Sequence, residues 1–444
     1  MTGVTLMARV RRIIFGMLRF GWSQRARAMA LFVAAVAPLA AQNRFQPSLL
    51  AQPDVAKAME SIDARSPAIV DEWVRLVEIQ APSGKEQARA QYIRVEMEKL
   101  GLTDIHTDDM FNVSGVRKGT GGGPTVVFCA HTDTVFPEGT PVKVKREGDT
   151  LTAPGVGDDT ANLMATLEMF RALNRGGVQT KGDLVFLASV QEELGLLGAK
   201  HWLDTALKTG GHKPDMFVAI DVAANQVWYG ALRISQLKFF YTSPGAHTME
   251  SRGAPSPAHA VAKAIAAEYE IPLPPVAPGL DSFKLPVINV GMLGGGTVFN
   301  ATPREAWFTV DLRSLDSETQ DKLETAVVST AKRAAEQEGV GFRMERQIAI
   351  DYSKARPQSE RLNHPLVQTA LATANYFRKP GSPEIKPADV GSTDANNAVA
   401  LGIPAVAVGA AMEHFPHRLE EWAEAGSIVP GIKSLLALAV SLTR

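Results

Sequence analysis

Three largely apolar stretches of the chain, residues 126–130, 183–190 and 216–220, are separated by segments with helical patterns. Strands that are apolar on both faces are typical of a parallel sheet covered by helices on both sides. In such sheets, functional groups lie at the carboxyl ends of the strands. The pattern therefore predicts an α/β fold with a mostly parallel sheet flanked by helices. The residues that follow these stretches are able to bind metals: His131 and Asp133, Glu192 and Glu193, and Asp221.

The spacing of His131 and Asp133 indicates how their side chains are arranged at the end of the first strand. Residues i and i+2 of an extended chain point to the same side, so the imidazole and the carboxylate emerge together. Such a pair suits a metal-binding histidine and the carboxylate that orients it. Further along, a glycine-bearing loop leads into Asp158 and Asp159, directly before an apolar helix. Acids are also favoured at helix N-termini, so one of the two could cap the helix while the other binds metal.

Residues 233–351 show a different order of elements: strand, helix, strand, strand, helix, strand. This order is typical of a ferredoxin-like α+β unit. A chain of 444 residues is also longer than the roughly 250–300 residues at which single cores usually stop growing. We therefore expect one domain made of residues 42–232 and 352–444, with residues 233–351 inserted as a second. In the first part, Ser83 and Glu86 have the spacing of a capping box, which predicts a helix over residues 85–100.

The first 41 residues differ from the remainder of the chain. Six arginines and no acid accompany an apolar run from Met29 to Leu39, and Ala40 and Ala41 follow it. A basic region, a short apolar region and small residues at its exit are typical of a secretory signal peptide. We expect residues 1–41 to be removed and the protein to be periplasmic or secreted, without stable membrane association. An N-terminal membrane anchor is the alternative, although the apolar run is short for a bilayer span.

The charge of the chain and its single cysteine exclude two kinds of function. The chain has 46 basic and 47 acidic residues, and removal of the arginine-rich segment leaves a net charge of about −7. A net acidic chain without a basic cluster is not expected to bind nucleic acid. The single cysteine, Cys129, falls within the first apolar stretch. It is therefore expected to be a core residue rather than a nucleophile.

Four motifs follow one another along the chain: H-T-D-T-V-F-P from His131, G-V-G-D-D ending at Asp159, the Glu192-Glu193 pair, and H-x-x-x-E-W from His417. Together they resemble the motifs of the M20 family of metallopeptidases and amidohydrolases, which includes peptidase T, carboxypeptidase G2 and acetylornithine deacetylase. The resemblance runs from about Asp54 to the C-terminus. It implies a zinc-peptidase catalytic domain, formed by residues 42–232 and 352–444, with a lid or dimerisation domain inserted at 233–351.

The resemblance also implies a ligand set for two zinc ions per chain, with Co²⁺ or Mn²⁺ as substitutes. His131 and Asp221 would hold one ion, and Glu193 and His417 the other. Asp158 would bridge the two. Nitrogen and carboxylate ligands without thiolates are the set that these metals accept.

The same resemblance implies that Glu192 is the general base and that Asp133 orients His131. Two positions stay open. Asp159 is the next candidate for the bridging ligand if the register differs by one residue. His414 offers a second imidazole near His417, which is preferred because Glu421 and Trp422 follow it at the family's spacing.

In the inserted domain, Gly245-Ala246-His247 resembles the segment of the family's lid histidine. The resemblance implies that His247 stabilises the developing oxyanion, often in the partner subunit of a dimer. Asn300 and Arg313 resemble residues that bind the substrate's carbonyl and carboxylate. A homodimer through the inserted domain is therefore expected, although these three side chains could also be surface polar groups.

The function implied is an exported di-zinc hydrolase that cleaves amide bonds of short peptides from one end, as an aminopeptidase, dipeptidase or tripeptidase. Asp221 at its position favours the peptidase members. The alternative on the same core is an N-acyl amino acid deacylase or a glutamate-type carboxypeptidase. A third possibility is a metal-free scaffold or binding protein, which would be expected to have lost at least one ligand.

Overall fold

The computed structural model of the protein describes residues 43–209, 213–275 and 286–444. The expected signal peptide, residues 1–41, lies outside the described residues. The first described elements are a short 3-10 helix, η1 (Pro47–Ala51), and two helices, α3 (Pro53–Val77) and α4 (Gln87–Lys99).

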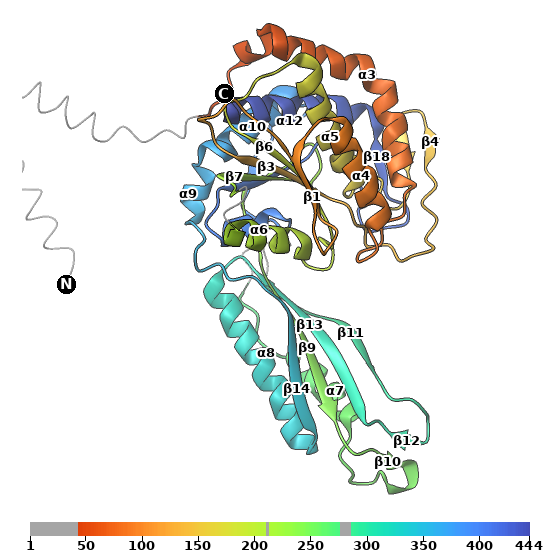
Figure 1. Ribbon diagram of the computed structural model, residues 1–444. Coiled ribbons are helices and arrows are strands. Elements are labelled where there is room, and N and C mark those ends of the chain that lie inside the picture. The colour runs from red at the N-terminus through yellow and green to blue at the C-terminus, as the bar shows by residue number, and fades with distance from the viewer. Residues whose placement is uncertain (1–42, 210–212, 276–285) are drawn as a thin grey trace, which may run out of the picture. The chain divides into compact units, whose positions relative to one another are not determined.

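A mixed eight-stranded sheet lies at the centre of the main domain (Figure 1). Its four inner strands, β6, β3, β7 and β16, run parallel to one another, whereas β2 pairs antiparallel with both β6 and β1. This arrangement confirms the α/β fold class. In spatial order the strands are β1 (Thr103–Thr107), β2 (Val113–Arg117), β6 (Leu184–Ser189), β3 (Val126–His131), β7 (Met216–Ile220), β16 (Ala405–Val408), β8 (Val227–Trp228) and β15 (Pro387–Ala388).

Helices cover both faces of this sheet, and alternate residues of β3 pack against different helices (Figure 1). Phe128 belongs to the apolar cluster that includes side chains of α3, α5 (Thr160–Gly176), α10 (Pro365–Phe377) and α12 (Ile428–Thr443). Val127 and Cys129 belong to the cluster with α6 (Leu197–Thr209) and α11 (Ala395–Ala400). Because successive side chains of a strand point to opposite faces, a fully apolar strand requires helices on both sides. Cys129 is buried there, as expected of a core residue.

A second, four-stranded sheet joins two distant parts of the chain. Its order is β17 (Met412–His414), β18 (Trp422–Glu424), β5 (Thr150–Thr152) and β4 (Lys145–Glu147), all antiparallel. Residues just before the Asp158 loop therefore pair with residues near the C-terminus. The remaining short elements of this domain are α9 (Gln358–Leu362) and η4 (Ala425–Ser427).

The inserted segment forms its own antiparallel sheet in the order β11-β13-β9-β14, which carries α7 and α8. The ferredoxin-like unit is thus present, and a two-stranded ribbon of β10 and β12 extends it. The predicted boundaries at residues 232 and 351 stay a prediction. The elements are β9 (Arg233–Thr242), β10 (Ala246–His247), η2 (Thr248–Glu250), α7 (Pro257–Glu268), β11 (Val287–Gly295), β12 (Ala301–Thr302), β13 (Glu305–Ser314), α8 (Ser317–Glu338) and β14 (Gly341–Ala349).

The capping-box prediction at Ser83 and Glu86 was wrong. Helix α4 begins two residues later than expected, at Gln87, and no side chain caps it. Instead, the Ser83 hydroxyl donates to the Asp133 carboxylate at 2.7 Å. Glu86 accepts the backbone N–H groups of Gly84 and Gln191 at 2.7 and 3.1 Å. Both side chains therefore hold loops at the strand ends rather than the helix terminus.

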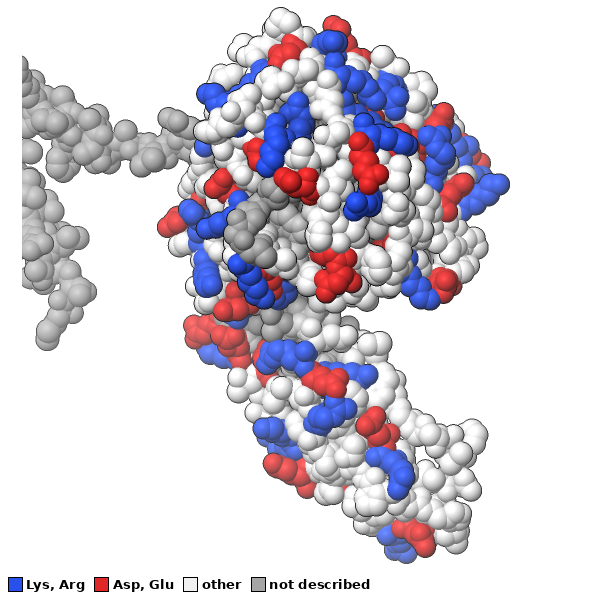
Figure 2. Space-filling model, in the orientation of Figure 1, with Lys and Arg blue, Asp and Glu red and all other residues white. Residues whose placement is uncertain are grey.

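Acidic and basic side chains are interspersed on the face of the molecule shown in Figure 2. The described residues on that face form no extended basic surface.

Candidate active site

The carboxyl ends of the inner strands bring the candidate ligands together. In the parallel register, His131 at the end of β3 lies opposite Ser189 at the end of β6, and β7 ends one residue before Asp221. The loop after β6 carries Glu192 and Glu193, and the segment after β17 carries His417. Parallel pairing places these ends at one edge of the sheet.

Two groups of ligand atoms share Asp158. One oxygen of its carboxylate lies 3.1 Å from Nε2 of His131, which is also 3.5 Å from Asp221. The other oxygen lies 3.0 Å from Nε2 of His417, which is 3.2 Å from Glu193. Within each group the donor atoms lie within 4.8 Å of one another. The five predicted ligands are therefore together, with the predicted bridging residue in the middle, and their roles as ligands stay predictions.

The two alternative positions make other contacts, and their roles as ligands stay predictions. Asp159 is fully buried and accepts the backbone N–H of His131 at 2.9 Å, and its side chain makes no capping hydrogen bond to α5. His414 stacks on Trp422, with ring centroids 3.8 Å apart, and its Nε2 lies 3.4 Å from Glu424.

Asp133 contacts both the His131 ring and the loop that carries Glu192 and Glu193. Its carboxylate lies 3.4 Å from Nδ1 of His131, which also contacts the Asp133 carbonyl at 3.1 Å. The same carboxylate accepts the backbone N–H groups of Glu192 and Glu193 at 3.0 and 3.2 Å. A carboxylate in this position fixes the ring orientation of a ligand histidine. Here it also fixes the loop that carries the predicted general base.

Electrostatics in the group are dominated by buried carboxylates. Burial raises the pKa of Asp221 to about 7, and the charge of Asp158 adds to the rise. Burial and Asp221 together raise the pKa of Glu192 well above its ordinary value. Hydrogen bonds to Asp158 and Glu193 raise the pKa of His417 to about 10. Strongly shifted pKa values of this kind are typical of functional sites, because charged groups are held close together there.

The loops that carry these side chains have uncommon backbone conformations. His417 itself has a φ of 64°, and Gln191, just before Glu192, has a φ of 51°. Residues other than glycine rarely adopt this left-handed region, which costs of the order of 1–3 kcal/mol per residue. Both positions therefore point to loops whose geometry is maintained for a function.

Glu421 is a functional residue whose role could not be predicted from the motif alone. Its carboxylate accepts the backbone N–H groups of Gly155, Gly157 and Asp158 at 2.9, 2.7 and 3.0 Å. Burial raises the pKa of Glu421 to about 7, and Asp158 contributes to the rise. The spacing from His417 marked the residue as part of the motif, but only the fold shows that it holds the Asp158 loop.

The three predicted residues of the inserted domain, His247, Asn300 and Arg313, do not all lie at one site. His247 on β10 pairs with Ala301 on β12, and His247 and Asn300 line one cavity of about 650 Å³. Arg313 lies on β13 outside that cavity and bonds to the Asp311 carboxylate at 3.1 Å. Among the described residues, none of the three forms a hydrogen bond or ion pair with the five candidate ligands, so their roles stay predictions.

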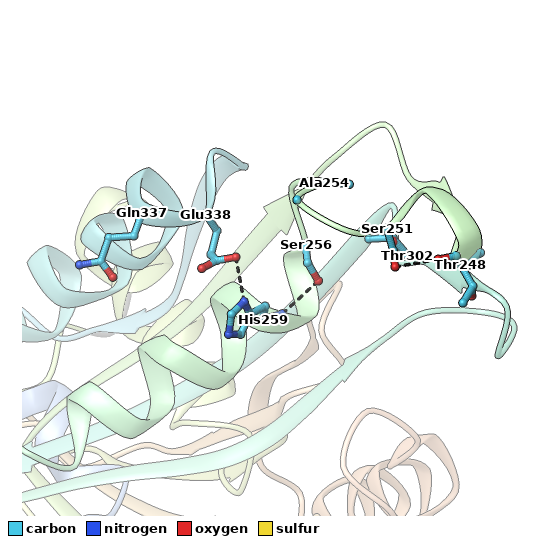
Figure 3. A pocket seen from close by; sticks show the side chains of 10 residues that line it. Thr248, Ser251, Ala254, Ser256, His259, Thr302, Gln337 and Glu338 are labelled. Atoms are coloured by element: carbon cyan, nitrogen blue, oxygen red, sulfur yellow. Dashed lines mark hydrogen bonds and ion pairs between the residues drawn. The ribbon is translucent and has the colours of Figure 1, made fainter.

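A second cavity of the inserted domain, of about 590 Å³, lies at the start of α7 (Figure 3). Several of its polar groups contact one another: the backbone N–H of His259 donates to the Ser256 hydroxyl at 3.3 Å, and the His259 ring lies 3.0 Å from the Glu338 carboxylate. In the main domain, Asp108, Asp109 and His201 form another cluster with metal-binding atoms. Asp108 there already accepts the backbone N–H groups of Met110 and Asn112, so it serves the turn between β1 and β2.

Comparison with known proteins assigns the family. The model described as "Peptidase family M20/M25/M40" matches residues 127–441. The chain belongs to this family. Carboxypeptidase G2 of Pseudomonas sp. (strain RS-16) is 23% identical over 350 residues, which cover 77% of this chain and 80% of the relative. The chain is accordingly an M20 hydrolase that acts on peptide or amide bonds.

Solved structures share the fold of this M20 hydrolase. Aminopeptidase PepT of Bacillus cereus ATCC 10987 matches with a TM-score of 0.62 at 20% identity, covering 85% of this chain and 98% of that one. Di-peptidase Dug1p of Saccharomyces cerevisiae matches with a TM-score of 0.68 at 13% identity, covering 88% and 99%. At these identities the likeness shows the fold: a catalytic domain with a mixed sheet and an inserted α+β domain.

The donor set of the M20 hydrolase fits divalent cations. Four buried or half-buried carboxylates converge with the imidazoles of His131 and His417: those of Asp158, Glu192, Glu193 and Asp221. One oxygen of Glu193 is buried without a hydrogen-bond partner among the described residues. Close carboxylates and an unsatisfied buried acceptor are costly unless a cation is bound between them.

Proposed function

We propose that this M20 hydrolase is an exopeptidase that uses two divalent cations, zinc in the first instance, to cleave short peptides. The observation that carries the proposal is the position of Asp158, which presents one oxygen to the His131 group and the other to the His417 group. A shared carboxylate between two nitrogen donors is the arrangement that suits two ions a few ångströms apart. Asp133 and Glu421 hold the two loops that make this sharing possible.

Cations held by this set would polarise the substrate carbonyl and lower the pKa of a water molecule between them. Glu192 would take the proton of that water, because one of its carboxylate oxygens lies within 4.8 Å of ligand atoms of His131 and Glu193. Its raised pKa matches a group that accepts a proton and then passes it to the leaving amine. His247 would donate to the oxyanion, and Asn300 and Arg313 would bind the substrate's carbonyl and carboxylate.

Two further parts of the proposal concern the whole protein. Residues 1–41 would act as a signal peptide, so that the mature enzyme is periplasmic or secreted. The inserted domain would form a homodimer. Its edge strand β11 carries the exposed side chains of Met292 and Leu293, and Phe299 is fully exposed in the following loop. Exposed apolar side chains on an edge strand are typical of a surface that another chain covers.

The substrate panel that tests the proposal contains di- and tripeptides beside N-acetyl amino acids. We expect release of terminal residues from the peptides, loss of activity with a chelator, and recovery on addition of Zn²⁺. Turnover of N-acetyl amino acids alone would instead support the deacylase alternative. A purified chain with no metal and no turnover on any compound would support the scaffold alternative.

A further inference from the structure

Arg89, on α4, lies behind the candidate metal centre. The residue is 2% exposed. One end of its guanidinium donates to the backbone carbonyl of Thr132 at 2.9 Å and to the hydroxyl of Thr160 at 3.1 Å. Thr132 stands between His131 and Asp133, and Thr160 is the first residue of α5, directly after Asp159. The guanidinium therefore connects the two segments that carry His131 and Asp158.

The other end of the guanidinium anchors these segments to α3. Nε and Nη2 donate to the carbonyl of Ile79 at 3.2 and 2.8 Å, and Nη2 also reaches the carbonyl of Val77 at 3.4 Å. Only a planar group with several N–H donors can bind carbonyls on two sides at once. A lysine at this position would keep the charge but could not span the same acceptors.

Arg89 forms no ion pair within 4.0 Å among the described residues, although the charges of three acids act on it: Asp133, Asp159 and Glu86. Each of these acids holds the backbone of a segment at the centre. Asp133 accepts from Glu192 and Glu193, Asp159 accepts from His131, and Glu86 accepts from Gln191. The guanidinium is thus a buried cation surrounded by the side chains that orient the candidate ligands.

We propose that Arg89 is a positioning residue of the metal centre: its guanidinium fixes the end of β3 against the start of α5, so that His131 and Asp158 face one another when a cation binds. This inference rests on the proposed function, because it concerns the same two-ion site. It adds a residue outside the ligand set on which the affinity for metal depends.

Charge and geometry predict opposite effects of losing Arg89. A cation near a cation site repels the incoming metal, so removal of the charge alone would raise metal affinity. Loss of positioning would lower it, because residues that orient the ligands typically contribute about 10–100-fold to metal affinity. The direction of the change therefore separates the two roles.

The experiment is a titration of the metal-free protein with Co²⁺, whose visible absorption reports ligand number and geometry. The variants are Arg89→Met and Arg89→Lys. The matched control is Arg117→Met, at the opposite edge of the sheet. Arg117 also donates to a backbone carbonyl, that of Val178 at 2.5 Å, and pairs in register with Leu184 at the far end of β6.

We expect both Arg89 variants to bind the first Co²⁺ about 10–100-fold more weakly, with an altered spectrum. Arg117→Met should keep the affinity and spectrum of the unmodified protein, even if its melting temperature falls. Unchanged affinity and spectrum in both Arg89 variants, or tighter binding by Arg89→Met, would overturn the inference. Normal Co²⁺ affinity in Arg89→Lys together with weakened affinity in Arg89→Met would also overturn it, because the planar guanidinium would then not be required.

If Arg89→Met does not fold, Arg89→Lys decides the matter, since it keeps the buried charge. A failure of the proposed function looks different. The unmodified protein would then show no visible absorption from bound Co²⁺, and both the proposed function and the role of Arg89 would be wrong.

Discussion

Glu421 accepts the backbone N–H of Asp158 at 3.0 Å, although 263 positions separate the two residues in the chain. The same oxygen accepts the N–H of Gly157, and its partner oxygen accepts that of Gly155. Gly157 also has no room for a side chain, because a Cβ there would lie 2.5 Å from Glu413. The conformation of the Asp158 loop is thus maintained by residues from the C-terminal part of the chain.

Replacement of Glu421 by Ala should therefore reduce metal binding, although Glu421 is not one of the candidate ligands. Three buried N–H groups would lose their acceptor, at a cost of about 1–3 kcal/mol each. We expect less than one ion per chain by elemental analysis and a lower melting temperature. Glu420→Ala, an exposed neighbour, is the control and should retain two ions. Full metal content in Glu421→Ala would show that the loop keeps its shape unaided.

Asp158 and His417 should differ in how many ions their loss removes. Asp158→Asn weakens both donor groups, because the amide nitrogen cannot replace a carboxylate oxygen as a ligand. His417→Ala weakens one group. We expect well under one ion per chain for Asp158→Asn and about one for His417→Ala. His414→Ala serves as the control, since its ring stacks on Trp422, and should retain two ions. Two tightly bound ions in His417→Ala would contradict its role.

Replacement of Glu192 by Gln should separate metal binding from turnover. The amide keeps the shape of the side chain but cannot accept the proton of an attacking water. We expect kcat to fall by about 10²–10⁴-fold, the usual contribution of a general base, with two ions still bound. The control is Glu147→Gln, an exposed carboxylate on β4. An active, metal-loaded Glu192→Gln enzyme would rule out this residue as the base.

His247→Ala should lower kcat by about 10²–10³-fold, as expected on loss of one oxyanion donor, and leave metal content unchanged. His259→Ala, in the same domain, is the control. Mixing His247→Ala with Glu192→Gln tests whether the histidine serves a partner subunit. Recovered activity in the mixture is expected if it does, because hybrid dimers then contain one complete site. Inactive mixtures that have exchanged subunits would place His247 in its own subunit's site.

Glu268, at the end of α7, should make stability depend on pH. It is fully buried, both carboxylate oxygens lack hydrogen-bond partners among the described residues, and burial raises its pKa to about 8. The unfolded chain loses this proton near pH 4.5, whereas the folded chain holds it until about pH 8. Stability from this group is therefore full below about pH 4.5 and is lost as the pH rises to about 8, by at most about 1.4 kcal/mol per pH unit.

Glu268→Gln should remove this dependence. In urea unfolding, the variant should match the unmodified protein near pH 5 and exceed it by a few kcal/mol near pH 8.5. Glu270→Gln, an exposed residue next to the same helix, should follow the unmodified protein at both pH values. A constant difference between Glu268→Gln and the unmodified protein at the two pH values would show that Glu268 is ionised throughout.

Much of the fold could be predicted from the sequence because apolar runs of strand length report burial on both faces, as for residues 126–131. The strand ends then located His131, Glu193 and Asp221 in one place. Local patterns were less reliable. Ser83 and Glu86 have the spacing of a capping box, but their side chains are engaged by Asp133 and Gln191. A long-range contact is not visible in local spacing. For the same reason, neither the role of Arg89 nor the contact of Glu421 with the Asp158 loop was predicted.

The small sheet β17-β18-β5-β4 has a consequence for how the enzyme matures. Strands β4 and β5 precede the loop of Asp158, but their partners are made only when the chain is nearly complete. Contacts between such distant segments form late, because a long loop must first be closed. An unfinished or C-terminally clipped chain that lacks β17 and β18 would also lack Glu421, which holds the Asp158 loop. Hydrolytic activity should therefore appear only after synthesis has ended.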